Sequence, residues 1–255
     1  MDEELTLLLI LHTFAALCFL LYILISLYGS KSKVIPPSSR ALIVIAHPDD
    51  EVMFFGPTIA NLTRDHEMNV HLLVLSRGNF RGEGNLRKME LYKAAEALSI
   101  SKDNITLLNY TKLQDNPKAR WSEELVADII YQYVESQDIG VILSFDRFGV
   151  SGHKNHSSIY NALLLLTSEE RSQSFRSNNT RILVLNSVNI LRKYSGIFDL
   201  PMSYALSPIS FIASPKDWIN IQKAMMCYGS QYVWFRKIYM IFSRYILINT
   251  YDILK

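Results

Sequence analysis

The chain has 255 residues and a formal net charge of +2, and hydrophobic residues make up 49% of it. This length suits one α/β domain with a short additional segment, and the composition can bury a substantial core. The small net charge argues against a nucleic-acid-binding protein. Cys18 and Cys227 are too few for a disulfide framework or a thiolate zinc cage, so we expect both to be buried bystanders.

The N-terminal segment Leu5–Tyr28 carries no charged side chain. A helix of about 24 residues is roughly 36 Å long and would cross a hydrocarbon core of about 30 Å. A cleaved signal peptide is the alternative, but it would have a basic start and a shorter apolar stretch, whereas acidic residues precede this one. We therefore predict a retained, single transmembrane anchor. Lys31, Lys33 and Arg40 follow it, which predicts that the bulk of the protein is cytosolic.

Residues 29–40, with Pro36, Pro37, Ser38 and Ser39, are expected to form an extended linker to a domain over residues 41–255. Strands and helices are predicted to alternate in this domain, which indicates a Rossmann-like, largely parallel sheet flanked by helices. The predicted strands are Ala41–Ala46, Asn69–Leu75, Ile105–Leu108, Ile139–Phe145 and Arg181–Asn186. The predicted helices are Asp50–Asp65, Asn85–Ser99, Ser122–Gln137 and His156–Ser168, the second burying Leu86, Met89, Tyr92 and Ala97.

Beyond Ser187 the alternation weakens, with an extra strand expected within Tyr204–Ala213 and a helix over Lys216–Tyr228. The segment Gln231–Tyr251 is rich in aromatic residues and contains three cations, which argue against a second transmembrane span. Two interpretations stay open for its part from residue 232 to 251. It is either an interfacial segment that lies against lipid or an ordinary part of the packed domain.

Polar residues gather directly after the first predicted strand, where His47, Pro48, Asp49, Asp50 and Glu51 follow one another. Ligands of open α/β sheets bind at the carboxyl ends of the strands. An imidazole and three carboxylates this close together would repel and solvate poorly without a cation, so we predict a divalent metal site. The alternative is that the carboxylates only complement the N-terminus of the following helix.

A second polar cluster, residues 146–156, follows the strand Ile139–Phe145 and contains His153 and His156. On a helical turn two residues three apart share a face. Two histidines and one carboxylate with an open fourth position are typical of a catalytic zinc site, which lowers the pKa of bound water to about 7. The remaining carboxylate and histidine would serve as proton acceptor and as leaving-group acid or oxyanion donor, as an amide hydrolase requires. A solvated histidine pair is the alternative interpretation.

The loop and helix start from Ser76 to Glu90 contain glycines that permit close approach to a ligand and three arginines that could bind a phosphate. The glycine spacing does not match a dinucleotide fingerprint. Arg87 and Glu90 are three apart and could instead pair on a helix face. Arg77, Asn79 and Arg87 are our candidates for substrate contact.

Three segments together resemble the N-acetylglucosaminyl-phosphatidylinositol de-N-acetylase family, a branch of the LmbE-like zinc deacetylases. They are HPDDE at residues 47–51, SRGNFRGEGNLRKMEL at 76–91 and FDRFGVSGHKNH at 145–156, and the likeness extends over residues 41–249. The resemblance implies that His47, Asp50 and His156 bind Zn²⁺ or another divalent metal. It also implies that Asp49 is the general base and that His153 stabilises the oxyanion or assists departure of the amine.

The activity that the resemblance implies is removal of acetate from N-acetylglucosaminyl-phosphatidylinositol, an early step of glycosylphosphatidylinositol-anchor synthesis. The expected place is the cytosolic face of the endoplasmic reticulum, with the glycolipid and the membrane as partners. The phosphodiester of that substrate would explain a cation at Arg77. Two alternatives stay open: a zinc deacetylase acting on a soluble N-acetyl sugar, and a catalytically silent, membrane-tethered binding protein.

Overall fold

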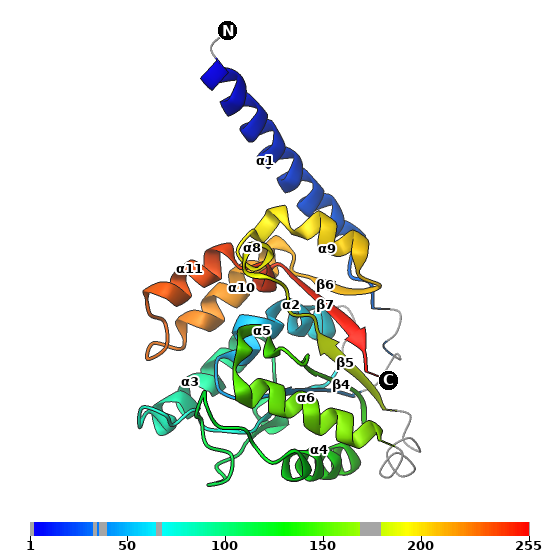
Figure 1. The fold of residues 1–255 in the computed structure, drawn as a ribbon, viewed down its shortest axis with the longest axis vertical. Coiled ribbons are helices and arrows are strands. Elements are labelled where there is room, and N and C mark those ends of the chain that lie inside the picture. The colour runs from blue at the N-terminus through cyan, green and yellow to red at the C-terminus, as the bar shows by residue number, and fades with distance from the viewer. Residues whose placement is uncertain (1–2, 33–34, 36–39, 65–67, 169–179, 255) are drawn as a thin grey trace.

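The computed structural model describes residues 3–32, 35, 40–64, 68–168 and 180–254. It contains a seven-stranded sheet between helices, and a long N-terminal helix that projects from the domain (Figure 1). The strands are ordered β3-β2-β1-β4-β5-β7-β6. Their bounds are β1 Arg40–Ile45, β2 Val70–Val74, β3 Ile105–Leu107, β4 Ile139–Phe145, β5 Arg181–Leu185, β6 Ile209–Ile212 and β7 Ile248–Ile253.

Strands β1 to β5 pair with one another in parallel, so the prediction of a Rossmann-like, largely parallel sheet is confirmed. Residues Ala41–Ile45 of β1 are fully buried, as expected for a strand that is covered on both faces. Strand β7 runs antiparallel between β5 and β6, and no separate strand was predicted for its residues. The expected strand within Tyr204–Ala213 is confined to β6.

Helices cover both faces of the sheet. One layer contains α2 Asp50–Arg64, α3 Gly84–Ala97 and α10 Pro215–Met226, and the other contains α4 Glu123–Gln137 and α6 Lys154–Thr167 (Figure 1). Ser122 caps the N-terminus of α4, because its Oγ accepts a hydrogen bond of 3.2 Å from the amide of Leu125. The short elements are η1 Lys102–Asn104, α5 Gly149–Gly152, α8 Ile190–Lys193, η2 Gly196–Phe198, α9 Leu200–Leu206, α11 Trp234–Phe242 and η3 Arg244–Ile246.

The face that α3 buries differs from the predicted one. Leu86 and Met89 are 43% and 59% exposed, whereas Arg87, Glu90 and Leu91 are buried. Polar side chains can occupy the inner face because each has partners there, as Glu90 does in accepting hydrogen bonds from the amide and hydroxyl of Ser230. Of the predicted apolar stripe, Tyr92 and Ala97 do pack partly buried against the core, whereas Leu86 and Met89 do not.

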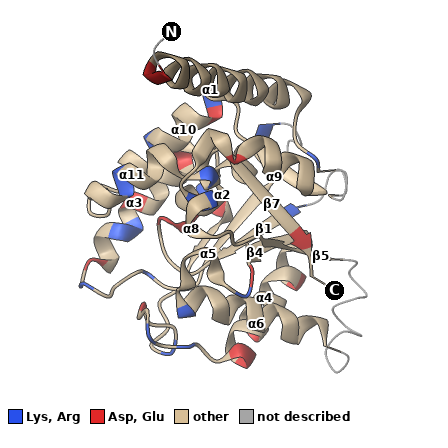
Figure 2. Ribbon diagram, turned by 45° about the horizontal axis from the view of Figure 1, so that its top comes forward, with Lys and Arg blue, Asp and Glu red and all other residues tan. Residues whose placement is uncertain are grey.

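The N-terminal helix α1 spans Glu3–Tyr28 and, in the described part of the chain, is the single helix long and apolar enough to cross a membrane. Figure 2 shows acidic residues at its N-terminal end and no charge along its middle. The segment after it is not wholly a free linker, because the amide of Lys31 donates to Ser210 of β6 at 2.8 Å. Residues 33 and 36–39 lie outside the described residues. Cys18 is buried as expected, whereas Cys227 is partly exposed.

Candidate active site

The two polar clusters meet at one edge of the sheet, because β1 and β4 are hydrogen-bonded neighbours. Residues 47–51 follow the carboxyl end of β1, and residues 146–156 follow the carboxyl end of β4. The carboxyl ends of adjacent parallel strands lie side by side, which is why residues about a hundred positions apart come into contact. The two clusters therefore converge in this structure.

Asp50 begins helix α2 but does not serve as an ordinary cap. Its Oδ2 accepts hydrogen bonds from the preceding amides of Ala46 and His47, at 3.2 and 2.9 Å, so the carboxylate faces back toward β1. Burial alone would raise the pKa of Asp50, but His156 and His47 hold it well below its usual range. The interpretation in which this carboxylate only complements a helix end is therefore wrong.

His153 is the N-cap of α6 and His156 lies in the first turn of this helix, with their rings stacked at 5.0 Å between centroids. His156 is buried against the ring of Phe145, and its Nδ1 donates to the carbonyl of Gly149 at 2.9 Å. The interpretation as a solvated histidine pair fails for His156. In the neutral ring, with the proton on Nδ1, Nε2 carries a lone pair.

That lone pair faces a carboxylate. His156 Nε2 lies 3.3 Å from Asp50 Oδ2, has no hydrogen-bond partner, and is buried. His47 Nδ1 lies 3.7 Å from the same oxygen, and the ligand atoms of the three residues lie within 4.8 Å of one another. Acceptor atoms this close in a buried site repel unless a cation lies between them. The set His47, Asp50 and His156 therefore matches the donor chemistry of a divalent metal site.

The hydrogen bonds of Asn155 favour this set over an overlapping one. Its amide nitrogen donates to the carbonyl of Ala119, so its Oδ1 must accept, and it receives His47 Nε2 at 3.1 Å. His47 Nδ1 is then left as the atom that faces Asp50. A second group of ligand atoms, formed by His47, Asp115 and His153, would need the same Nε2 without its proton. The hydrogen bond between His47 and Asn155 thus favours the group formed by His47, Asp50 and His156.

Asp49 lies beside the candidate metal site and between two arginines. Its Oδ2 is 2.8 Å from Arg236 of α11, and its Oδ1 is 3.4 Å from Arg87 of α3. Burial raises the pKa of Asp49, and the two guanidinium groups oppose that rise. Its φ of 100° lies in a region that favours glycine, so the turn holds this carboxylate in a strained conformation.

Glu51, the third carboxylate of the motif, stabilises this turn through hydrogen bonds. Its Oε2 accepts the amide of Asp49 at 3.1 Å, and its Oε1 accepts the hydroxyl of Tyr228 at 2.5 Å. Burial raises the pKa of Glu51 to about 8. Its role is to hold the backbone that presents Asp49.

His153 is the less buried histidine and is held neutral. Its Nδ1 accepts the amide of Asn155 at 3.3 Å, which leaves the proton on Nε2. Burial first, and then the positive charge of His47 and His156, lower its pKa to about 4. A neutral ring with one N–H suits a hydrogen-bond donor to a developing oxyanion.

Arg87 lines a cleft next to His153 and also links the segments on either side of that cleft. Its guanidinium donates to the carbonyls of Pro48 and Gly78 at 2.5 and 3.0 Å, and it pairs with Asp49 and with Asp115 at 3.3 Å. Arg87 therefore does not form the alternative pair with Glu90. The rest of this cleft, which measures about 260 Å³, is lined by residues that include Arg81, His153, Phe235 and Arg236.

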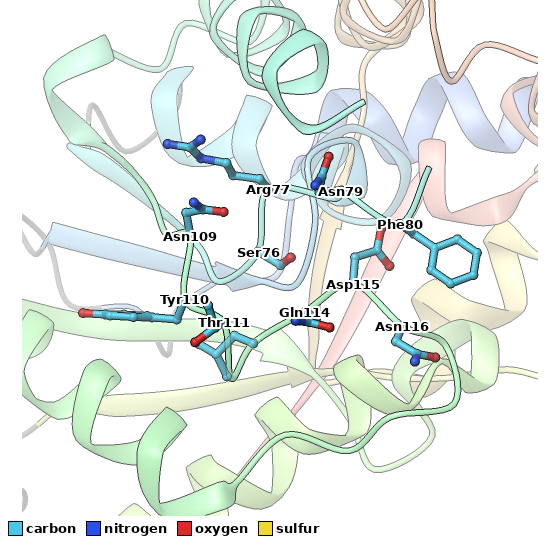
Figure 3. A pocket seen from close by; sticks show the side chains of 11 residues that line it. Ser76, Arg77, Asn79, Phe80, Asn109, Tyr110, Thr111, Gln114, Asp115 and Asn116 are labelled. Atoms are coloured by element: carbon cyan, nitrogen blue, oxygen red, sulfur yellow. The ribbon is translucent and has the colours of Figure 1, made fainter. Parts of the chain in front are cut away.

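Arg77 and Asn79 lie in a neighbouring cavity of about 430 Å³ (Figure 3). Phe80 and Asp115 line both cavities, and in Figure 3 the side chain of Arg77 extends away from Asp115. Asn79 Oδ1 accepts the amide of Gly84 at 2.9 Å, so this side chain also fixes the start of α3. Of the three substrate candidates, Arg87 alone borders the cleft with His153.

Three further residues of the site escaped the sequence analysis. Asn155 lies inside the second motif and was overlooked because an amide is not a metal ligand. Asp115, whose Oδ1 is 3.2 Å from His47 Nε2, comes from a loop without a pattern. Arg236 lies in the aromatic-rich segment, where a cation suggests a solvated face, and long-range packing alone brings it to Asp49.

The sequence is similar to those of known proteins. The sequence model of the family described as "PIG-L: GlcNAc-PI de-N-acetylase" matches residues 42–166. The N-acetylglucosaminyl-phosphatidylinositol de-N-acetylase of Bos taurus is 40% identical over 218 residues, covering 85% of this chain and 84% of that protein. The chain belongs to the GlcNAc-PI de-N-acetylase family.

Solved structures share the architecture of this GlcNAc-PI de-N-acetylase family member. N,N'-diacetylchitobiose deacetylase from Pyrococcus horikoshii aligns with a TM-score of 0.59 and 15% identity, covering 85% of this chain and 84% of that one. The zinc-inhibited form of teicoplanin deacetylase Orf2 aligns with a TM-score of 0.53 and 16% identity, covering 76% and 85%. At these identities the likeness establishes the fold.

Proposed function

We propose that this protein hydrolyses the N-acetyl group of N-acetylglucosaminyl-phosphatidylinositol to give glucosaminyl-phosphatidylinositol and acetate. The observation that carries the proposal is the juxtaposition of Asp49 with His47, Asp50 and His156, in a chain 40% identical to a relative named for this activity. The same juxtaposition argues against a catalytically silent binding protein, because a silent protein has no need of a strained, buried carboxylate beside a metal site.

His47, Asp50 and His156 would hold a divalent cation, and their two imidazoles and one carboxylate suit Zn²⁺. When bound, the cation would supply Lewis-acid polarisation and acidify a water molecule. Hydrogen bonds from the other ring nitrogens would orient both imidazoles. His47 donates to the side chain of Asn155, and His156 donates to the carbonyl of Gly149.

Asp49 would accept a proton from the attacking water through its carboxylate. The water oxygen adds to the acetyl carbonyl carbon, the carbon–nitrogen bond breaks, and the proton passes to the nitrogen of the glucosamine. His153 would donate its Nε2–H to the carbonyl oxygen as negative charge develops there. The acetic acid that forms ionises and its proton passes to the amine, so the products are acetate and an ammonium group, and atoms and charges balance.

The phosphodiester of the glycolipid would be recognised by cations around the cleft. Arg77, Asn79 and Arg87 are the proposed contacts, and Arg81 and Arg236 add positive charge to the cleft that contains His153. Arginine suits this task because its planar donors match phosphate oxygens.

We further propose that α1 anchors the protein in the endoplasmic reticulum membrane with its domain in the cytosol. Support comes from the length and hydropathy of α1 and from Lys31 and Arg40 after it. Asn155, which begins an N-x-S sequon, is fully buried in the site, so a lumenal orientation with a glycan there would conflict with the proposed function.

The test measures acetate release by the full, metal-loaded chain, reconstituted with N-acetylglucosaminyl-phosphatidylinositol. We expect Asp49→Asn to lower kcat by about 10²- to 10⁴-fold without loss of bound metal, because one general base is removed. Asp103→Asn, an exposed carboxylate of η1 at the amino end of β3, is the control. Unchanged turnover in Asp49→Asn would remove Asp49 from the base role.

Two other outcomes would replace the proposal. Equal acetate release from a lipid-free N-acetyl sugar would favour a soluble substrate. No release from either substrate by a chain that holds its metal would favour the binding protein.

A further inference from the structure

Helix α11 has two faces that differ in chemistry. Its outer face exposes Trp234, Phe235, Ile238, Ile241 and Phe242, the tryptophan to 73% of its area. Its inner face presents Arg236, Tyr239 and Met240 to the domain, with the hydroxyl of Tyr239 donating to the carbonyl of Met53 at 2.9 Å. Five large apolar side chains on one side of a nine-residue helix are far more than scattered surface residues.

A second group of exposed apolar side chains lies on the neighbouring elements α8, η2 and α9. Ile190, Leu191, Phe198, Met202 and Leu206 are exposed there, Leu191 to 79%. Turn η2 contacts both α9 and α11, and Figure 1 shows α8, α9 and α11 in the same tier of the molecule, next to the lower part of α1. We call the exposed faces of α8, η2, α9 and α11 the apolar platform.

Contacts with α1 fix the position of the platform along the axis of this helix. The ring of Phe14 stacks on Phe198 of η2 at 5.7 Å, and the hydroxyl of Tyr22 donates to the carbonyl of Ala213 at 2.9 Å. Phe14 is fourteen residues from the end of α1, or about 21 Å along the axis, and the part before it is only about 17 Å long. That free part cannot by itself cross a hydrocarbon core of about 30 Å.

If α1 crosses a membrane, the platform therefore lies at the level of the lipid. An apolar groove supports this arrangement: Leu11, Phe14 and Ala15 of α1 and Phe198 of η2 line an open cavity of about 410 Å³. Lys237 of α11 is exposed beside the platform, as suits an anionic headgroup layer.

We propose that the apolar platform is immersed in the lipid interface beside α1, and that α11 forms both part of this surface and one wall of the catalytic cleft. Phe235 carries the connection, because it is exposed on the platform and lines the cleft that contains His153. On the inner side, Arg236 reaches Asp49 at 2.8 Å. A lipid substrate would then present its sugar to the cleft while its acyl chains stay in the bilayer.

Contact with lipid is tested in the full chain, reconstituted in phosphatidylcholine vesicles whose acyl chains carry bromine, which quenches tryptophan fluorescence on contact. Trp121 is buried and Trp218 is partly buried, so Trp234 is the exposed tryptophan among the described residues. We expect strong quenching in the native chain and loss of most of it in Trp234→Phe. Quenching that is the same in both chains would overturn the proposal. If a second copy covers the platform, Trp234 escapes the bromine and cross-linking captures a dimer, which also overturns it.

The consequence for catalysis rests on the proposed function and is measured separately. We expect Ile238→Asp with Ile241→Asp to lower kcat/KM for bilayer substrate about tenfold, and to leave turnover of a lipid-free N-acetylglucosaminyl-inositol phosphate at the native level. Leu164→Asp on α6, an exposed leucine in the opposite helix layer, is the matched control and should change neither rate. Loss of both rates in the double variant, or of neither, would count against the platform. Failure of the native chain on both substrates would instead reject the proposed function, and the quenching result would still decide the proposal.

Discussion

Two residues of the site, Asn155 and Arg236, act on neighbouring side chains and are not themselves candidate metal ligands. Asn155 is fully buried, and its amide orientation sets which nitrogen of His47 faces Asp50. Arg236 sets the charge around Asp49. Neither side chain belongs to the candidate metal ligands, yet each determines the protonation of a group that does the chemistry.

Asn155→Leu keeps a similar volume and removes the acceptor for His47 Nε2. We expect the affinity for Zn²⁺ to fall about 10- to 100-fold, because an unsupported imidazole changes tautomer and orientation. Titration against a chelator of known affinity measures this. Asn161→Leu, which removes an amide of the same helix that contacts Glu123, should bind zinc normally. Native affinity in Asn155→Leu would show that another contact orients His47.

Arg236→Gln removes the nearer of the two cations beside Asp49. Because Arg236 lowers the pKa of Asp49, its loss raises that pKa, and the base is then protonated at pH values where the native enzyme works. We expect the acid limb of the kcat/KM profile to move to higher pH by about one unit. Arg236→Lys should restore most of the native profile. A uniform loss of rate at every pH would point to a structural role instead.

At the scale of elements, the loop between β4 and α6 decides where His156 lies. Gly149 has a φ of 61°, and a Cβ added there would lie 2.6 Å from the Cβ of His156. Gly152 has a φ of 73° and open space around it. Substitutions at these two glycines can therefore distinguish a steric contact with the candidate metal ligand His156 from backbone strain alone.

Gly149→Ala should lower the unfolding free energy by about 1 to 3 kcal/mol and weaken metal binding, because the new methyl group displaces His156. Gly152→Ala carries the backbone strain alone and should bind metal with native affinity. Thermal unfolding and metal titration of both variants test this. Equal metal affinity in the two variants would refute the steric explanation.

The packing of β2 against α4 gives a pH-dependent term outside the active site. His71 is buried near Tyr133, and burial, followed by the charge of Arg40, lowers its pKa. A folded-state pKa below the unfolded value of about 6.5 means that the unfolded state binds the proton more tightly. The folded state therefore loses stability as the pH falls through about 6.5, because His71 is protonated more readily in the unfolded state. Well above that pH, His71 has no effect on stability.

We expect native protein to lose more stability than His71→Gln between pH 7.5 and 5.5, measured by thermal unfolding in one detergent. The two chains should keep a constant difference above pH 7.5. Parallel stability curves across the whole range would show that His71 titrates equally in the folded and unfolded states.

At the scale of the whole molecule, a bound cation would link the two halves of the sheet edge. His47 and Asp50 follow β1, His156 follows β4, and their ligand atoms lie within 4.8 Å of one another. Zn²⁺ at about one hundred times its dissociation constant should therefore stabilise the folded state by about 2.7 kcal/mol. Chelation should lower the Tm of the native chain and leave that of His156→Ala unchanged. An equal response in both chains would place the stabilising metal elsewhere.

The local pattern predicted most of the first five strands, because each is a short apolar run followed by turn residues, and periodicity is a local property. It was misled where polar residues are buried with distant partners. Arg87 and Glu90 occupy the inner face of α3 because Asp49, Asp115 and Ser230 meet them there. Strand β7 pairs with β5 and β6, and those pairings are invisible in its own six residues.

The amino-acid sequence by itself determined the parallel α/β class, the apolar N-terminal helix and the two motifs that supply the candidate metal ligands, since all of these are written in contiguous residues. The tertiary structure decided which nitrogen of each histidine is available, that Arg236 reaches Asp49, and that α11 lies between the cleft and an exposed apolar surface. Those features depend on contacts between segments far apart in the chain, and only the folded packing brings them together.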